Sequence, residues 1–154
     1  MQKHKEPLDI AFSQLGVKED PIGSNWGKQV SAYLKGVGVN FAAPWCAAFV
    51  YWCFNEAYGD KNPLCRTGGV LKMWNDTPHK YRSKEPAKGD IFIFDYGSGK
   101  GHTGIIYDVD GMTLHTIEGN TNSTGSREGY EVATKKRMSI DKKLRGYLRI
   151  TPME

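Results

Sequence analysis

Two short segments of the chain contain the residue types that nucleophilic catalysis needs. Cys46 follows Pro44 and Trp45 at the start of an apolar run, and His102 lies in a later segment beside Gly101. A thiol attacks as its thiolate, which the unpaired N–H groups and the dipole of a helix N-terminus stabilise. If the apolar run is a helix, the same N–H groups could also receive the oxyanion of an attacked carbonyl. Cysteine and histidine together predict acyl-transfer chemistry.

A third group is expected opposite His102. Asp110-Gly111 separates two β-like runs and is a strong hairpin signal, which would bring His102 nearly opposite Glu118 or Asn120. Residues two apart share a strand face, so both side chains could reach the site. The segments therefore predict a thiolate, an imidazole, and a carboxylate or amide that orients the imidazole. We expect the glycines beside His102 to keep the approach open to a substrate.

The remaining histidines and cysteines suit other roles better. His4 and His79 are expected at the surface, and His115 lies mid-strand on the face opposite Glu118. Cys53 follows Cys46 by seven residues, which predicts core packing, and Cys65 has no obvious partner. Three irregularly spaced cysteines indicate neither a disulfide framework nor a zinc knuckle. A zinc site of Cys46, Cys53 and His102 is disfavoured, because ligands two helical turns apart are about 10 Å from each other.

The elements that must position these residues change type halfway along the chain. Helices are predicted over 8–15 with Gly16 as C-cap, and from a cap at Ser24 or Asn25 to an end marked by Gly36 and Gly38. Two more are predicted, one that begins between Pro44 and Cys46 and runs to Ala57, and one over 70–76. The third is apolar nearly all round, which predicts a buried central helix. Short β-branched or aromatic runs then predict strands over 91–94, 103–109, 113–118, 130–136 and 147–150. Helices followed by an antiparallel sheet indicate an α+β domain.

Composition bounds the classes of function. With 154 residues and no linker, the chain is expected to form one domain over residues 1–154. The longest apolar run, 45–54, is too short to span a bilayer, and we find no secretory hydrophobic region. The net charge of +4 is concentrated late in the chain, which could attract an acidic polymer. A solvated face of terminal strands is the favoured interpretation, because no nucleic-acid motif accompanies the charge.

Four motifs in their order along the chain resemble the CHAP family of cysteine, histidine-dependent amidohydrolases/peptidases, which is related to the NlpC-type hydrolases and has a papain-like core. The resemblance covers about residues 15–150. The motifs are Trp45-Cys46-Ala47-Ala48-Phe49-Val50, Gly89-Asp90-Ile91, His102-Thr103-Gly104-Ile105 and Ile117-Glu118-Gly119-Asn120-Thr121. The implied fold has N-terminal helices packed on a five- to six-stranded antiparallel sheet, with the catalytic cysteine at the N-terminus of a buried helix.

The resemblance implies that bacterial peptidoglycan is cleaved at the muramoyl–L-alanine amide or within the stem peptide or cross-bridge. It makes Cys46 the nucleophile, His102 the general base, Glu118 the residue that orients this base, and Asn120 a supporting polar group. Trp45 resembles the aromatic residue that commonly precedes the nucleophile and is expected to line the substrate groove. Some CHAP domains bind calcium before the cysteine. Residues 38–44 contain no carboxylate, so we expect no metal and no cofactor.

Other substrates and settings stay open. The same residues would serve a cysteine protease or transglutaminase-like enzyme on proteins, and a non-catalytic wall- or protein-binding module would merely retain them. We expect a monomer that binds no nucleic acid, has no membrane span, is made in the cytoplasm, and reaches the wall through a holin or a secretion machine. The first route fits a phage lysin and the second an antibacterial effector, which would usually travel with an immunity protein.

Overall fold

The helices come first along the chain. The computed structural model describes residues 5–121 and 129–154. The α-helices of this part are α1 (Pro7–Ser13), α2 (Lys28–Gly36), α3 (Cys46–Tyr58) and α4 (Val70–Asp76), with short 3-10 turns η1 (Gly59–Lys61) and η2 (His79–Tyr81). None of the helices in the described ranges has the length and apolar character needed to cross a bilayer.

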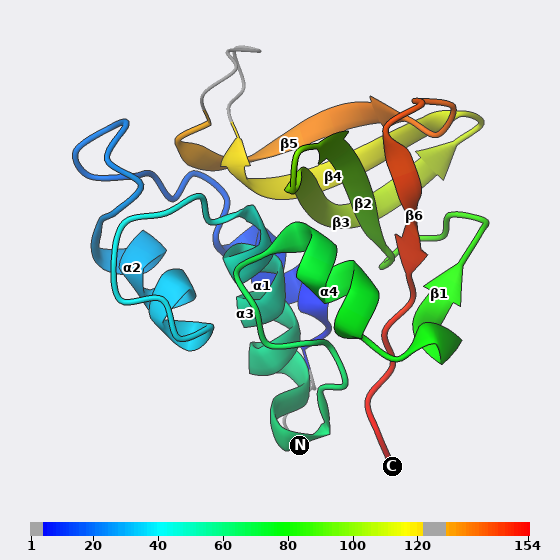
Figure 1. The fold of residues 1–154 in the computed structure, drawn as a ribbon, viewed down its shortest axis with the longest axis horizontal. Coiled ribbons are helices and arrows are strands. Elements are labelled where there is room, and N and C mark those ends of the chain that lie inside the picture. Colours follow the sequence, from blue (N-terminus) through cyan, green and yellow to red (C-terminus); the bar gives the residue numbers. More distant parts are fainter. Residues whose placement is uncertain (1–4, 122–128) are drawn as a thin grey trace.

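The strands form one antiparallel sheet in the order β1-β6-β2-β3-β4-β5 (Figure 1). They are β1 (Arg82–Ser83), β2 (Ile91–Gly97), β3 (Lys100–Asp110), β4 (Thr113–Thr121), β5 (Glu131–Met138) and β6 (Leu144–Leu148). The predicted α+β class, with N-terminal helices packed on a five- to six-stranded antiparallel sheet, is confirmed. The two-residue β1, which pairs only with the end of β6, was not predicted.

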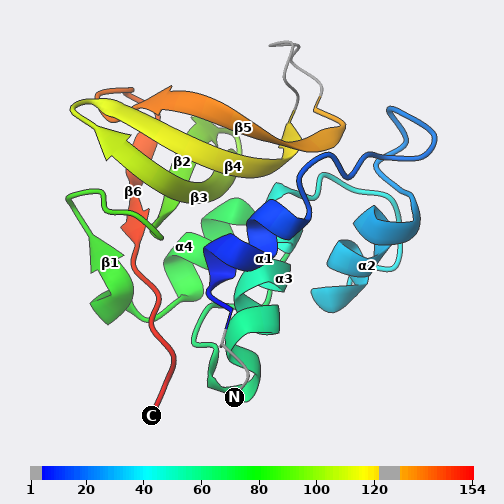
Figure 2. The ribbon, with the colours of Figure 1, turned by 180° about the vertical axis from the view of Figure 1, so that it is seen from behind.

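Helix α3 is the centre of the helical layer, as its uniform apolarity predicted. Both views show α1, α2 and α4 arranged around it, and the layer lies against one side of the sheet (Figures 1 and 2). Phe49 and Phe54 are fully buried, and burial of each such side chain contributes about 1.5–3 kcal/mol. The helix ends at Tyr58, and its C-cap Gly59 has a φ of 55°, in the left-handed region that glycine adopts without strain.

The sheet carries a second apolar cluster on the face away from the helices. Ile93, Ile105 and Ile117 belong to the core that includes α3, whereas their neighbours in the strands form a separate cluster. Its buried members are Phe92, Phe94, Ile106, Leu114 and Tyr147. The Arg137 guanidinium on β5 lies 5.6 Å from the ring centre of Phe94 on β2, although β3 and β4 separate these two strands. This distance indicates that the sheet curls over the second cluster. The face away from the helices is therefore concave.

The start of α2 differs from the sequence prediction. The helix begins at Lys28 after Gly27, not after a cap at Ser24 or Asn25. The Ser24 hydroxyl instead accepts the backbone N–H of Trp26, and Asn25 has a φ of 55°. These features make a turn that helical geometry cannot follow. Helix α1 likewise ends at Ser13, before the predicted cap at Gly16, whose N–H donates to Val132 on β5.

Candidate active site

Cys46 is the first residue of α3. Trp45 occupies the N-cap position and makes no side-chain capping bond, so the first N–H groups of the helix are left without intrahelical partners. The Cys46 side chain is nearly buried in the core, with 6% of the residue exposed. A thiol in this place is close to N–H donors and to the positive end of the helix dipole, as the sequence predicted.

His102 on β3 lies between Cys46 and Glu118. Its Nε2 is 2.7 Å from Glu118 Oε1, and its side chain also interacts with the Cys46 thiol. Burial lowers the pKa of His102, but the hydrogen bonds and negative charges of Cys46 and Glu118 outweigh burial and raise this pKa to about 9. The three side chains that the sequence singled out are thus brought together, with an imidazole held in its charged form.

Glu118 is fully buried, and other hydrogen bonds hold it in place. Arg137 on β5 donates from Nε to Oε2 at 2.8 Å and from an Nη to Oε1 at 2.6 Å, and the Thr116 hydroxyl donates to Oε2 at 2.6 Å. Burial raises the pKa of Glu118, but the hydrogen bonds from Arg137 and His102 lower it to about 2. The carboxylate therefore stays ionised despite its burial.

Arg137 is a site residue that the sequence reasoning missed. The sequence showed it only as one of the basic residues late in the chain. The pairing register places Ala133, not Arg137, directly opposite Glu118. Arg137 pairs with Leu114, and its long side chain reaches along the strands to Glu118. Its one signal in the sequence is alternation along β5, which puts Lys135 and Arg137 on the same face as Ala133.

The prediction that Trp45 lines a substrate groove is wrong. Trp45 is fully buried, stacks on Tyr33 at 5.7 Å between ring centres, and donates from Nε1 to Glu19 Oε2 at 2.7 Å. Glu19 is itself 2% exposed, and its other oxygen accepts the N–H of Gly23. Trp45 therefore ties the start of α3 to the loop between α1 and α2, a role that sequence alone did not indicate.

The glycines of β3 pack closely instead of opening the approach to His102, which corrects a second expectation. A Cβ at Gly104 would lie 2.5 Å from Cγ of Glu118 and 2.8 Å from the Phe92 ring. A Cβ at Gly101 would lie 2.5 Å from the Phe94 carbonyl oxygen. The absence of a side chain at Gly104 thus leaves the space through which Glu118 reaches His102.

Asn120 stands at the edge of a cavity of about 720 Å³ that adjoins His102. Its backbone has a φ of 55°, and its buried Oδ1 has no hydrogen-bond partner among the described residues. The hydrogen-bond acceptor of His102 is Glu118, so of the two expected polar groups Glu118 is the one that orients the ring. Asn120 therefore lies beside the site and holds a buried acceptor without a donor among the described residues.

The other candidate residues lie away from this cluster. Cys53 is fully buried in the core, and burial raises the pKa of its thiol, in agreement with the predicted packing role. His115 pairs with Asp108 near the hairpin turn and packs on Tyr107 at 5.9 Å between ring centres. His79 is exposed, and His4 lies outside the described residues.

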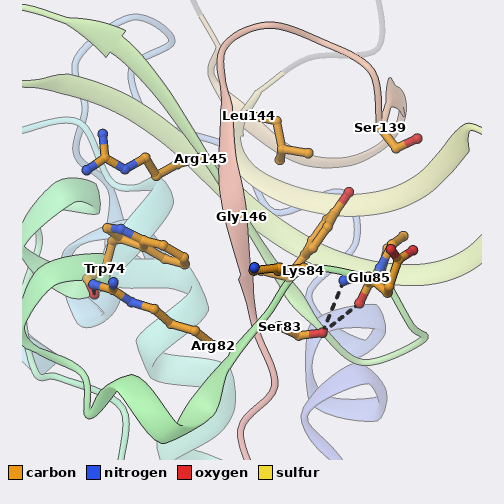
Figure 3. Close-up of a pocket in the computed structure, with 11 residues that line it drawn as sticks. Trp74, Arg82, Ser83, Lys84, Glu85, Ser139, Leu144, Arg145 and Gly146 are labelled. Carbon is orange, nitrogen blue, oxygen red and sulfur yellow. Dashed lines mark hydrogen bonds between the residues drawn. The ribbon is translucent and has the colours of Figure 1, made fainter.

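A second cavity of about 570 Å³ lies between α4, β1 and β6 (Figure 3). Arg82 stacks on Trp74 at 4.1 Å and donates to the Trp74 carbonyl, and the Ser83 hydroxyl donates to the Glu85 carbonyl. Neither Cys46 nor His102 lines this space. It is therefore separate from the cysteine and histidine.

The residues that the structure describes form no cluster suited to a metal ion. Within residues 5–121 and 129–154, no group of three or more His, Cys, Asp or Glu side chains is arranged to hold a metal ion. The expectation of a metal-free and cofactor-free site stays a prediction.

Comparison with known proteins identifies the family of the chain. The family model of the CHAP domain matches residues 38–120, more than half of the chain, and these residues include Cys46, His102, Glu118 and Asn120. The chain belongs to the CHAP family. Arg137 lies beyond the matched segment, so the family match alone does not reach it. Among curated proteins, none matches the chain.

Two solved structures share the fold. The crystal structure of Ly7917 has a TM-score of 0.59 and 18% identity, over 99% of this chain and 63% of that one. The crystal structure of Ly7917 with the hydrolyzing product of MDP has a TM-score of 0.55 and 16% identity, over 98% of this chain and 63% of that one. The chain thus spans less than two thirds of Ly7917, and at this identity the likeness establishes the fold.

Proposed function

We propose that this protein is a peptidoglycan hydrolase that cleaves an amide bond through a thioester at Cys46. The contact of His102 with both Cys46 and Glu118 carries the proposal, because it supplies a nucleophile, its proton carrier and the group that orients that carrier. Membership of the CHAP family supports the reaction class. The Ly7917 complex with the hydrolyzing product of MDP supports a wall-derived substrate.

The first half-reaction joins the acyl group to sulfur. The Cys46 thiolate attacks the scissile carbonyl carbon, a C–S bond forms, and the carbonyl π electrons move onto oxygen, beside the N–H groups at the start of α3. When the C–N bond breaks, the His102 imidazolium gives its proton to the leaving nitrogen. Because Nε2 faces Glu118, Nδ1 is the nitrogen assigned to this transfer.

The second half-reaction releases the acid. Neutral His102 takes a proton from water as the water oxygen attacks the thioester carbonyl, and the C–S bond then breaks. Thiolate and imidazolium are regenerated together. Glu118 stays ionised throughout, since its own pKa of about 2 is far below that of His102, and it holds the ring through Nε2. Arg137 acts through Glu118 as a positioning residue.

The direct test uses purified peptidoglycan and mass spectrometry of the released fragments. Under reducing conditions the wild type should release fragments with new amine and carboxyl ends, and these ends identify the bond that is cut. Cys46→Ala should release none, because no other thiol lies beside His102. Cys65→Ala, which removes a half-buried thiol elsewhere, is the matched control and should stay active.

A wild type that leaves several wall types intact under these conditions would contradict the proposal. Casein digested in parallel separates the alternatives. Cleavage of casein alone would indicate a protease, and the absence of any cleavage together with retention on sacculi would indicate a binding module.

A further inference from the structure

The charge of the cavity beside His102 is unbalanced. Among the described lining residues, four are basic and one is acidic. We call this space the cationic cavity, and its basic residues are Lys100, Lys135, Arg137 and Lys143, with Asp141 as the carboxylate. Clustering of like charges is costly, so a cavity of this kind favours an anionic ligand that would compensate it.

The four cations come from separate parts of the fold, and they differ in their freedom. Lys100 begins β3 at the turn after β2, and Lys143 lies between β5 and β6; both are exposed. Arg137 is already held by Glu118 through two hydrogen bonds. Lys143 Nζ lies 5.1 Å from the centre of the Tyr96 ring, so an aromatic side chain is next to this charge. Lys100 and Lys143 are therefore the cations best placed to contact a ligand that enters from solvent.

Asn120, which lines the cavity, also has a hydrogen-bond acceptor without a donor in the described part of the chain. The buried Oδ1 of Asn120 has no partner among the described residues, and a buried acceptor without a donor costs free energy that a ligand N–H would recover. An ionised carboxylate beside a peptide N–H would satisfy both the cations and Asn120. Inorganic phosphate or a phosphate polymer would meet the cations but has no N–H for Asn120.

The geometry points to a binding subsite in the cationic cavity for an ionised carboxylate of the substrate peptide, with Lys100 and Lys143 contacting the carboxylate and Asn120 accepting a neighbouring amide N–H. This inference rests on the proposed function, since it names the part of the wall that lies next to His102. The stem peptide carries such carboxylates, whereas the glycan backbone between its stem attachments does not. The subsite would select stems by the charge state of their carboxyl groups.

The test uses muramoyl peptides in matched pairs, in which one carboxyl group at a time is either free or converted to its primary amide. For one pair the wild type should prefer the ionised member by about fivefold in kcat/KM, mainly through KM, the size expected of a partly exposed charge pair. The double variant Lys100→Gln/Lys143→Gln should lose this preference. The control Lys61→Gln/Lys136→Gln removes the same charge from exposed sites outside the cavity and should keep it.

A second measurement does not depend on turnover. Calorimetry with Cys46→Ala should show the same preference in affinity, and this preference should weaken as salt screens the charges. Inorganic phosphate at equal concentration and constant ionic strength should not displace the ionised probe.

Equal kcat/KM for both members of every pair would overturn the subsite while leaving the hydrolase proposal intact. If no probe and no peptidoglycan is cleaved, the hydrolase proposal fails, and the calorimetric preference decides the subsite by itself. Displacement by phosphate would assign the cavity to phosphate groups and would also overturn the inference.

Discussion

At the scale of single residues, Glu118 is the group on which the site depends. It is a fully buried carboxylate that accepts from His102 and Thr116 and, through two bonds, from Arg137. A buried charge is tolerated only when its partners are in place, and removal of one partner leaves it uncompensated. The free energy of this cluster should therefore respond strongly to changes at Arg137.

We predict that Arg137→Met lowers the free energy of unfolding by about 3–5 kcal/mol, since it leaves Glu118 buried with one cation fewer. The pKa of Glu118 should rise, because the Arg137 hydrogen bonds lower it. The acid limb of the kcat/KM profile should then move to higher pH, a shift that a purely structural role would not cause. Urea unfolding and a pH profile measure the two effects.

Two further variants separate charge from geometry. Arg137→Lys keeps the charge but loses the two-pronged contact, so it should retain part of the stability and little of the activity. Arg137→Met combined with Glu118→Gln removes both charges and should recover stability relative to Arg137→Met alone. An unchanged pH profile in Arg137→Met would refute the positioning role.

Glu118→Gln should cost activity more than stability, because the Arg137 side chain that loses its partner is 22% exposed to water. The amide keeps the shape but cannot stabilise an imidazolium, so kcat/KM should fall by about 10²- to 10⁴-fold. The matched control Glu56→Gln alters an exposed glutamate on α3 and should leave kcat/KM unchanged. A Glu118→Gln enzyme with wild-type kinetics would show that the ring needs no carboxylate.

The dependence of stability on pH follows from the same pKa shifts. The pKa of His102 is raised from 6.5 to about 9, so its stabilisation is complete below pH 6.5 and is lost as pH rises through about 9. The pKa of Glu118 is lowered from 4.5 to about 2, so its stabilisation is present above pH 4.5 and is lost as pH falls through about 2. Their joint contribution to the free energy of unfolding should be greatest between pH 4.5 and 6.5.

Urea unfolding of the wild type and of His102→Gln at pH 5.5, 8 and 9.5 checks this window. The wild type should lose stability from pH 5.5 to 9.5, and His102→Gln should lose less over the same range. Parallel slopes for the two proteins would show that His102 does not titrate as its contacts imply.

Sequence alone could reach Cys46 and His102 because each follows from local pattern. Cys46 starts an apolar helix, and a single hairpin turn brings His102 near Glu118 or Asn120. The choice of Glu118 as the orienting group came from the family resemblance. Arg137 was out of reach because no turn signal in the sequence fixes the register of β5 on β4, in which Arg137 pairs with Leu114, four residues from Glu118. Trp45 was misplaced because its partner, Glu19, lies in a loop whose path sequence does not fix.

At the scale of elements, the contact between α3 and β4 sets the position of the nucleophile. Gly119 on β4 faces the helix, and a Cβ there would lie 2.7 Å from Phe49 Cβ and 2.8 Å from the Trp45 ring. Such distances cannot be accommodated without movement of the helix, and overpacking of this kind costs about 1–3 kcal/mol. The start of α3 and therefore Cys46 would move with it.

We predict that Gly119→Ala and Gly104→Ala both reduce kcat by at least about tenfold, for different reasons. The first displaces Cys46 through α3, whereas the second displaces Glu118, whose Cγ would lie 2.5 Å from the new methyl group. Gly36→Ala, at the end of α2 with nothing within 4 Å of the added atom, is the control and should be neutral or stabilising. Wild-type activity in Gly104→Ala would mean that Glu118 does not need the space beside Gly104.

The elements were predicted well where periodicity was strong. Helix α4 has the predicted bounds, and α3 differs only by its last residue. The start of α2 was misplaced because Asn25 adopts a left-handed conformation that its residue type permits but does not require. Strand β1 has two residues, which is too short for any alternation to show.

At the scale of the whole molecule, the core draws on residues from almost the full length of the chain. The cluster between the helices and the sheet extends from Ala11 on α1 to Ile150 after β6, and β6 pairs with both β1 and β2. The CHAP match ends at residue 120, before β5 and β6. The matched segment therefore lacks Arg137 and part of the concave cluster.

We predict that residues 1–154 unfold as one cooperative unit and that a chain ending at residue 121 does not fold. The shorter chain would lose Tyr147 and Leu148 from the core, leave β2 and β4 as unpaired edges, and bury Glu118 without Arg137. Circular dichroism and fluorescence should give coincident thermal transitions for the full chain and no cooperative transition for the shorter one. Two separated transitions in the full chain would contradict the single domain that its sequence predicts. A folded shorter chain would show that the site needs only the matched segment, in which case Glu118 must find another cation or take up a proton.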